Sequence, residues 1–215
     1  MSPLFIDEVL TPSQKAVWIQ LSRFKQIGIL AGGTALAFQL KHRRSFDFDI
    51  FTPKNIPENF SGKIKKNFGE DIEIFKESEI DLTFYTPTKV KITFFHYPFK
   101  PLYPIVRTPS APIFSWKEIA ADKAYTLGRR PIYRDYVDLF FIIKRGHKLK
   151  AIILDAQKKF SVLFSEKLFL EQLTYFGDLQ EFGIEFLQKE YAPGEIKSFF
   201  EKVVENYTKD KIKYC

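Results

Sequence analysis

The chain has 215 residues, of which 45% are hydrophobic and 27% charged, and its formal net charge is +7. These values are typical of a globular protein with one compact domain, or with one domain and a smaller helical appendage, and they exclude a chain that is mainly disordered. The single cysteine, Cys215, excludes an internal disulfide and a cysteine-based zinc site, and the three histidines are too widely spaced for a histidine-rich metal site.

Targeting signals and charge set the expected compartment and partners. No apolar run approaches the roughly 18 residues of a membrane span, so we expect no membrane association. The N-terminal segment carries Asp7 and Glu8 where a signal peptide would have a basic start and an apolar block, which predicts a cytoplasmic protein. The net charge of +7 favours polyanionic partners such as nucleotides or RNA, although solubility alone also explains it.

Helical and strand patterns alternate in the first part of the chain. Thr11, Pro12 and Gln14 form a helix-start signal, in which a capping threonine is followed by a proline in the first turn and a glutamine that closes a capping box. The elements expected here are a helix over 12–24, a strand over 28–31, a helix over 34–40, a strand over 46–51 and a helix over 57–68.

Strand patterns and then only helical patterns follow. A turn at 86–88 predicts a hairpin, and the proline-rich loop 98–112 leaves room for one edge strand. The expected strands are 71–75, 80–85, 90–95 and 103–106, and the expected helices are 115–128, 133–144, 148–160, 165–176, 178–189 and 195–207. This order predicts an α+β fold, with a mixed sheet flanked by helices in 1–112 and a helical region in 113–215.

The segment from the first diglycine to the next strand carries the strongest chemical signal. Gly32 and Gly33 at a helix start allow a phosphate to approach backbone N–H groups and the positive end of the helix dipole. Alternation places Asp47 and Asp49 on one face of the strand over 46–51, where two carboxylates suit Mg²⁺. The opposite face is expected to carry Phe46, Phe48 and Ile50. Taken separately, each feature is also explained by a tight turn or by a solvated strand face, but together they are what nucleotidyl transfer needs.

Two segments carry a specific family resemblance. The sequence GGTALAFQLKHRRSFDFDIF over 32–51 resembles the signature of AbiEii/AbiGii-type nucleotidyltransferases, which are toxin components of abortive-infection and toxin–antitoxin systems. These proteins belong to the polymerase-beta-like nucleotidyltransferase superfamily. A second block over 118–139 resembles the family pattern of a helical lysine, a later arginine and a final Arg-Asp-x-x-Asp-Leu. The matching residues are Lys123, Arg129 and Arg134-Asp135-x-x-Asp138-Leu139.

The resemblance implies a Mg²⁺-dependent (or Mn²⁺-dependent) nucleotidyltransferase. Such an enzyme moves a nucleoside monophosphate from an NTP to an acceptor hydroxyl on RNA, for example a tRNA 3′ end, or on a protein, and a separately encoded antitoxin restrains it. The implied roles are metal binding and catalysis by Asp47 and Asp49, catalysis by Lys123 and Asp138, and nucleotide binding by Gly32, Gly33, Thr34, Arg44, Ser45, Arg129 and Asp135.

The second block also has a purely structural explanation. Asp135 and Asp138 share one face of a helix, beside an apolar stripe where an unpaired carboxylate would be costly to bury. A helix–helix ion pair, from Lys123 to Asp138 or from Arg130 to Asp135, would account for them without catalysis.

One position departs from the superfamily pattern. Many members place a third carboxylate on a later strand, and the inner-face residue of the matching strand over 90–95 is Thr93. Asp81, on the preceding strand, is a weak substitute. This departure leaves open a degenerate nucleotide-binding protein on the same fold. The aromatic-rich C-terminal half separately leaves open a helical interaction module. Burial of its Phe residues in a core explains that half more simply.

Overall fold

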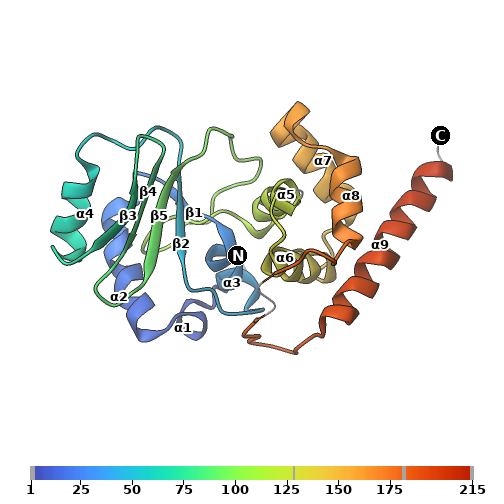
Figure 1. Ribbon diagram of the computed structural model, residues 1–215, viewed down its shortest axis with the longest axis horizontal. Helices are drawn as coiled ribbons and strands as arrows, with labels where there is room; N and C mark the ends of the chain where they lie inside the picture. Colours follow the sequence, from blue (N-terminus) through green and yellow to red (C-terminus); the bar gives the residue numbers. More distant parts are fainter. Residues whose placement is uncertain (1–2, 128, 181–182, 214–215) are drawn as a thin grey trace. The chain divides into compact units, whose positions relative to one another are not determined.

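The computed structural model describes residues 3–127, 129–180 and 183–213, and Figure 1 shows their helices and strands. The chain forms two compact units, Met1–Ser115 and Trp116–Cys215. The first contains a sheet with helices and the second contains helices, so the predicted α+β fold with a helical C-terminal part is confirmed. Two expectations, the helix end at Gly128 and the lone Cys215, concern positions outside the described residues. Across the described ranges, no helix is both long and apolar enough to cross a membrane.

A mixed sheet organises the first unit. Among its described residues, five strands lie in the spatial order β1-β2-β5-β4-β3. β2 and β5 are parallel, and the other neighbouring strands are antiparallel. The strands are β1 (Ile29–Leu30), β2 (Phe48–Thr52), β3 (Glu73–Glu77), β4 (Asp81–Tyr85) and β5 (Lys91–His96).

Helices complete the first unit: α1 (Ile6–Val9), α2 (Pro12–Leu21), the 3-10 helix η1 (Ser22–Phe24), α3 (Gly32–Leu40) and α4 (Phe60–Phe68). α2 begins with the predicted capping box, because the Thr11 side chain accepts from the backbone N–H of Gln14 and the Gln14 side chain accepts from the backbone N–H of Thr11. α1 was not predicted, since four residues are too few to show a helical period.

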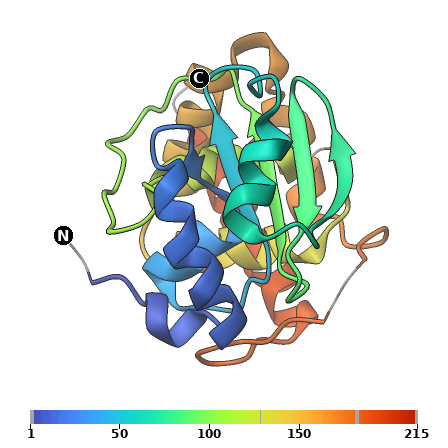
Figure 2. The ribbon, with the colours of Figure 1, turned by 90° about the vertical axis from the view of Figure 1, so that its left-hand side faces the viewer.

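Aromatic rings form the core between the sheet and the helices that cover one of its faces. Figure 2 shows α2 and α4 in front of the sheet. Trp18 stacks on Phe48 with ring centroids 6.2 Å apart. Phe24 contacts Phe94 at 5.6 Å and Phe68 at 5.8 Å. Each such pair adds attraction beyond its buried area, at offset or edge geometries like these.

Strand β2 has one buried face, as predicted, but it begins later than expected. Phe48 and Ile50 are buried on the helix-covered side. Phe46, which we expected on that side, is 51% exposed and lies outside the strand. The reason is local: the Thr34 hydroxyl donates to the backbone carbonyl of Asp47, so the chain before Phe48 follows α3 and not the sheet.

The second unit consists of helices in its described residues: α5 (Trp116–Leu127), α6 (Tyr133–Lys144), α7 (Leu149–Phe160), the 3-10 helix η2 (Ser161–Leu163), α8 (Glu166–Thr174) and α9 (Pro193–Lys213). Four of them match expected helices closely. α9 extends past the expected end at residue 207, because its last turns keep good helix formers such as lysine.

The helix expected over 178–189 is wrong in the residues that the structure describes, which leave out 181–182. The backbone N–H of Gln180 donates to the Pro131 carbonyl at 3.0 Å, and the N–H of Tyr133 donates to the Gln180 carbonyl at 3.1 Å. This bridge to the start of α6 uses both backbone groups of Gln180, so they cannot join a helical ladder.

Two smaller boundaries also differ from expectation. The helix expected over 57–68 begins later, because Asn59 adopts a left-handed conformation with φ of 56°. The edge strand expected over 103–106 is reduced to one antiparallel bridge between Val106 and Ile113. Proline-rich sequence explains this reduction, since proline donates no hydrogen bond to a ladder.

Candidate active site

Helix α3 begins at two glycines directly after β1, and the first of them contacts Asp49. Gly32 has a φ of +64°, in the left-handed region that favours glycine. A Cβ atom placed on Gly32 would lie 2.9 Å from Oδ2 of Asp49. The Asp49 carboxylate therefore packs directly against the backbone at the start of α3, in a space that a larger residue would fill.

The second glycine brings a cation and a hydroxyl to the same place. A Cβ atom on Gly33 would lie 2.6 Å from Nη2 of Arg43 and 3.0 Å from Oγ of Ser45. A guanidinium, a hydroxyl and the positive end of a helix dipole thus converge, and together they favour an anion such as phosphate. We call this group the diglycine corner: Gly32, Gly33, Arg43, Ser45 and Asp49.

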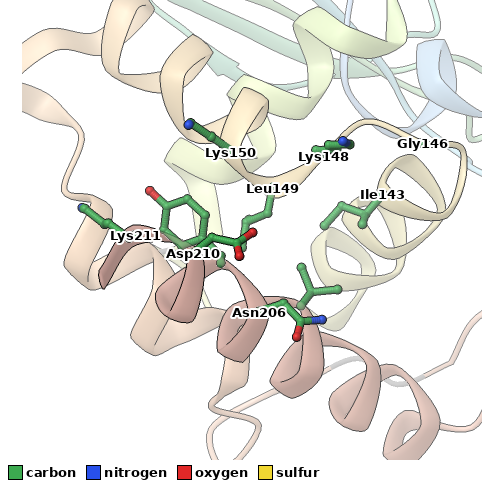
Figure 3. Close-up of a pocket in the computed structure, with 10 residues that line it drawn as sticks. Ile143, Gly146, Lys148, Leu149, Lys150, Asn206, Asp210 and Lys211 are labelled. Carbon is green, nitrogen blue, oxygen red and sulfur yellow. The ribbon is translucent and has the colours of Figure 1, made fainter. Parts of the chain in front are cut away.

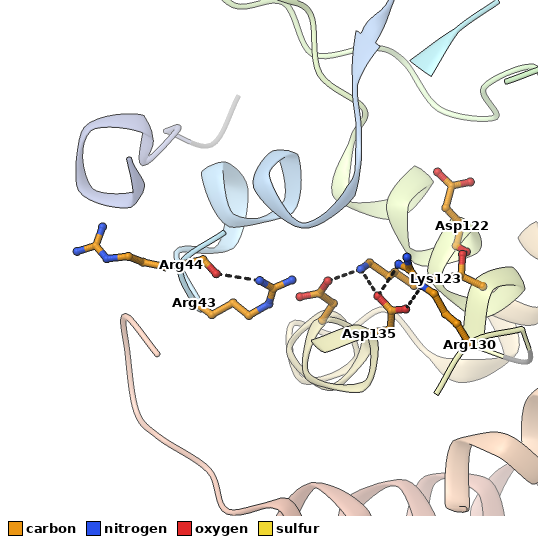
Figure 4. A network of polar contacts seen from close by, with 8 residues as sticks. Arg43, Arg44, Asp122, Lys123, Arg130 and Asp135 are labelled. Atoms are coloured by element: carbon orange, nitrogen blue, oxygen red, sulfur yellow. Dashed lines mark hydrogen bonds and ion pairs between the residues drawn. The ribbon is translucent and has the colours of Figure 1, made fainter. Parts of the chain in front are cut away.

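Adjacent arginines take different directions. Arg44, which we predicted as a nucleotide-binding residue, donates from its guanidinium to the Val9 carbonyl at 2.9 Å, and Figure 4 shows it pointing away from Arg43. Arg43 reaches the corner, and it also donates to the Arg44 carbonyl at 2.8 Å. Sequence reasoning missed Arg43, although Arg43 and Ser45 are two residues apart and would share a side of an extended segment.

Both predicted metal-binding aspartates are tied to the start of α3 through their backbones. The Thr34 hydroxyl donates to the Asp47 carbonyl, and the Ala31 N–H donates to the Asp49 carbonyl at 2.8 Å. Their carboxylates are hard oxygen donors, which suit Mg²⁺ or Mn²⁺. Among the described residues, no three His, Cys, Asp or Glu side chains gather as a metal site. An aspartate pair fits an ion that takes its remaining ligands from water and substrate phosphates.

The position expected to carry a third carboxylate holds a threonine. Thr93 is the Cα partner of Asp49 on the parallel neighbour β5. The next strand places Thr83 opposite Thr93, and the Thr83 hydroxyl donates to Asp81 at 2.8 Å. Asp81 in turn pairs with Lys76 at 3.0 Å. A row of hydroxyls therefore extends from Asp49 across the sheet, and Asp81 lies two strands away in an ion pair of its own.

The second predicted block forms a buried ion cluster in the helical unit. Nζ of Lys123 lies 2.5 Å from Oδ1 of Asp135 and 2.6 Å from Oδ2 of Asp138. Lys123 is 6% exposed, Asp135 1% and Asp138 0%. Arg130 donates from Nε to Asp135 at 2.9 Å, and Figure 4 shows these contacts. We call these four side chains the Lys123 cluster. Burial by itself would raise the pKa of Asp135, but the charges of Lys123 and Arg130 hold that pKa below its usual value.

Both ion pairs of the purely structural explanation are thus present, and the catalytic role of Lys123 and Asp138 stays a prediction. An ammonium group has three donors, and two carboxylates account for two of them. The two ion pairs therefore fix the orientation of the Lys123 side chain. Our expectation that Lys123 faces Asp47 and Asp49 also stays a prediction.

A second buried lysine lies in the helical unit, and no motif predicted it. Lys159 of α7 pairs with Glu118 and, at 2.5 Å, with Asp122, both on α5. We call these three side chains the Lys159 cluster. The available signal was the spacing of Glu118 and Asp122, which share a helix face, but nothing in that spacing points to a lysine on another helix.

Arg129, predicted to bind nucleotide, makes local contacts. Its guanidinium donates to the carbonyls of Tyr125 at 2.9 Å and Leu163 at 2.8 Å. It also stacks on the Tyr125 ring at 3.6 Å from the ring centroid. These contacts join the end of α5 to η2, and a nucleotide contact by Arg129 stays a prediction.

The helical unit also contains a groove of about 700 Å³ between the start of α7 and the end of α9 (Figure 3). Its lining includes the apolar residues Ile143, Leu149 and Val203 and also lysines such as Lys148 and Lys211. None of the described residues that we predicted for the site lines this groove.

The chain is similar to known proteins both in its sequence and in its fold. Residues 19–206 match the sequence model of the family described as "Nucleotidyl transferase AbiEii toxin, Type IV TA system". The chain is also 31% identical over 187 residues to the uncharacterized protein aq_aa25 of Aquifex aeolicus strain VF5, covering 83% of this chain and 86% of that protein.

Two solved structures share the fold. MenT4, the nucleotidyltransferase toxin Rv2826c of Mycobacterium tuberculosis H37Rv, has a TM-score of 0.58 at 16% identity, covering 89% of this chain and 80% of that one. JHP933 of Helicobacter pylori has a TM-score of 0.53 at 15% identity, covering 95% and 97%. At these identities the likeness concerns the arrangement of the chain and not its residues.

Proposed function

Because the chain belongs to the AbiEii family of nucleotidyltransferase toxins of type IV toxin–antitoxin systems, we propose that it moves a nucleoside monophosphate from an NTP to an acceptor hydroxyl. The acceptor oxygen bonds to the α-phosphorus, the bond to the leaving pyrophosphate breaks, and the hydroxyl proton of the acceptor passes to solvent water. The observation that carries this proposal is the diglycine corner, where a carboxylate and a guanidinium meet the start of a helix.

The corner supplies the contacts that a triphosphate needs. Backbone N–H groups at Gly32 and Gly33 and the hydroxyl of Ser45 bind phosphate oxygens, and Thr34 fixes Asp47 through its carbonyl. Arg43 neutralises phosphate charge at Gly33, the role that we first gave to Arg44. Fixed donors of this kind need no reorganisation when charge develops in the transition state.

Asp47 and Asp49 would hold Mg²⁺ or Mn²⁺, which supplies positive charge at the phosphates. Lys123 contributes a further positive charge toward the phosphates, oriented by Asp135 and Asp138, and Arg129 contributes to nucleotide binding. In the cytoplasm, transfer to an essential acceptor would arrest growth until a separately encoded antitoxin opposes it.

The test is incubation with labelled NTPs, Mg²⁺ and total tRNA or total protein. We expect the wild type to label an acceptor and the variant Asp47→Ala plus Asp49→Ala to label none. A matched control is Asp71→Ala, which removes one exposed acid remote in sequence from the corner. If wild type and the double variant give the same labelling, the enzyme proposal fails.

A second function is favoured by the threonine at position 93. Without a third carboxylate beside Asp49, the same corner could bind nucleotide without turnover. Calorimetry with each NTP, run beside the transfer assay, separates the two. Binding without product supports the binding protein, and no binding to wild type contradicts both functions.

A further inference from the structure

The sheet face that carries Asp49 continues into a group of aromatic rings. Phe51 follows Asp49 by two residues on β2, and Phe95 follows Thr93 by two residues on β5. Phe51 and Phe95 are Cα partners, just as Asp49 and Thr93 are. Side chains two residues apart on a strand share a face, so both rings stand on the side of the predicted chemistry.

Both rings pack against other aromatic rings, and one of them, Phe95, is partly exposed to solvent. Phe51 stacks on Tyr97 with centroids 4.4 Å apart and contacts the buried Phe114 edge-on at 6.0 Å. Phe95 packs against Phe51 at 6.1 Å and remains 38% exposed. A ring that is held in place on one side and exposed on the other is a surface for stacking a planar ligand.

The position of the rings along the sheet suggests which of the two substrates, the NTP or the acceptor, they would contact. Asp49 meets Gly32 at the diglycine corner near the start of β2, and Phe51 lies toward the other end of β2, roughly 7 Å from Asp49 at about 3.4 Å per strand residue. Phosphoryl transfer places attacking and leaving oxygens roughly in line. If pyrophosphate leaves at the corner, the acceptor hydroxyl approaches from the side of Phe51 and Phe95.

We propose that Phe95, which packs against Phe51, stacks the terminal base of a single-stranded nucleic acid acceptor. This inference rests on the proposed function and narrows its acceptor to nucleic acid. A serine or threonine side chain of a protein acceptor has no planar ring to stack, whereas every nucleobase has one. The net charge of +7 adds attraction for a polyanion.

The experiment compares three variants of the full chain. Phe95→Ala removes the open ring, Phe95→Trp keeps an aromatic face, and Phe75→Ala is the matched control, because Phe75 is 75% exposed on β3 of the same sheet. The probe is a fluorescein-labelled four-nucleotide single-stranded RNA with a free 3′ hydroxyl, measured by anisotropy without NTP. Calorimetry gives the affinity for each NTP.

We expect Phe95→Ala to weaken RNA binding by roughly five- to one-hundredfold, as loss of one stacked base does. Phe95→Trp and Phe75→Ala should bind RNA like wild type, and NTP affinities should not change. Equal RNA binding by Phe95→Ala and Phe75→Ala, no RNA binding by wild type, or a loss confined to NTP affinity would each overturn the inference. Because this assay involves no turnover, a failure of transfer itself is seen separately in the labelling experiment.

Discussion

Helix α5 contributes to two buried clusters that look alike but differ in sequence signal and in access to solvent. In the Lys123 cluster, the ammonium group lies between Asp135 and Asp138. In the Lys159 cluster, it lies between Glu118 and Asp122. The first belongs to the family motif, whereas the second matches no motif.

The two clusters also differ in one half-exposed side chain, which belongs to the Lys123 cluster alone. The Lys123 cluster includes Arg130, whose side chain is 50% exposed. The side chains of Lys159 and Glu118 are 0% exposed, and that of Asp122 is 14% exposed. A lysine between two carboxylates is therefore a structural arrangement that this helical unit uses twice. The motif alone does not make Lys123 catalytic, and Lys159 provides an internal control for that role.

The largest expected effect is on stability. Lys123→Met and Lys159→Met should each lower the free energy of unfolding by about 3–5 kcal/mol, because each removes a buried ammonium group that lies between two carboxylates. Urea denaturation measures both. The matched control is Lys158→Met, at an exposed position next to Lys159, which should change stability by less than about 0.5 kcal/mol. If Lys159→Met leaves the free energy of unfolding unchanged, the two clusters are not equivalent in the fold.

Transfer activity should separate the lysines. Lys123→Ala should lower the kcat/KM of the folded protein by about a hundredfold or more, since it removes a charge placed for the transition state. Lys159→Ala should leave the activity of the folded protein within about threefold. Both are assayed at a temperature where circular dichroism confirms folding. Equal losses in the two variants would leave Lys123 with a structural role alone.

A smaller effect is expected for Arg130. Arg130→Ala should lower the free energy of unfolding by about 1 kcal/mol, because its half-exposed charge is screened by solvent and Lys123 still pairs with Asp135. Urea denaturation beside Lys123→Met tests this order. A loss as large as that of Lys123→Met would mean that Arg130 compensates the buried carboxylates as strongly as Lys123 does.

Acid should reveal the smallest effect. The pKa of Asp135 is held below its ordinary 3.8 by Lys123 and Arg130 despite burial. As the pH falls below that ordinary value, the unfolded chain takes up a proton before the folded one, so this contribution to stability is lost progressively through the folded pKa. At neutral pH it is fully present. The midpoint temperature of thermal unfolding, measured between about pH 5 and 2, should fall less steeply with decreasing pH in Asp135→Asn than in the wild type. Equal slopes in the two proteins would contradict this assignment.

Much of the fold was predictable because its signals are local. The capping box at Thr11, the alternation around Asp49 and the helical periods of α5, α6 and α7 all lie within short segments. The helix expected over 178–189 failed for the opposite reason, since Gln180 bonds to the backbone at the start of α6. Local helix propensity is overridden where a distant segment supplies hydrogen-bond partners for the backbone.

The sequence by itself determined the α+β order of elements and the family, because both depend on patterns within short segments of the chain. Only the tertiary structure decided that Arg43 and not Arg44 reaches Gly33, and that Lys159 pairs with Glu118, 41 residues away. The direction of a side chain in a turn and the partner of a buried charge depend on packing between distant segments, and no local pattern records them.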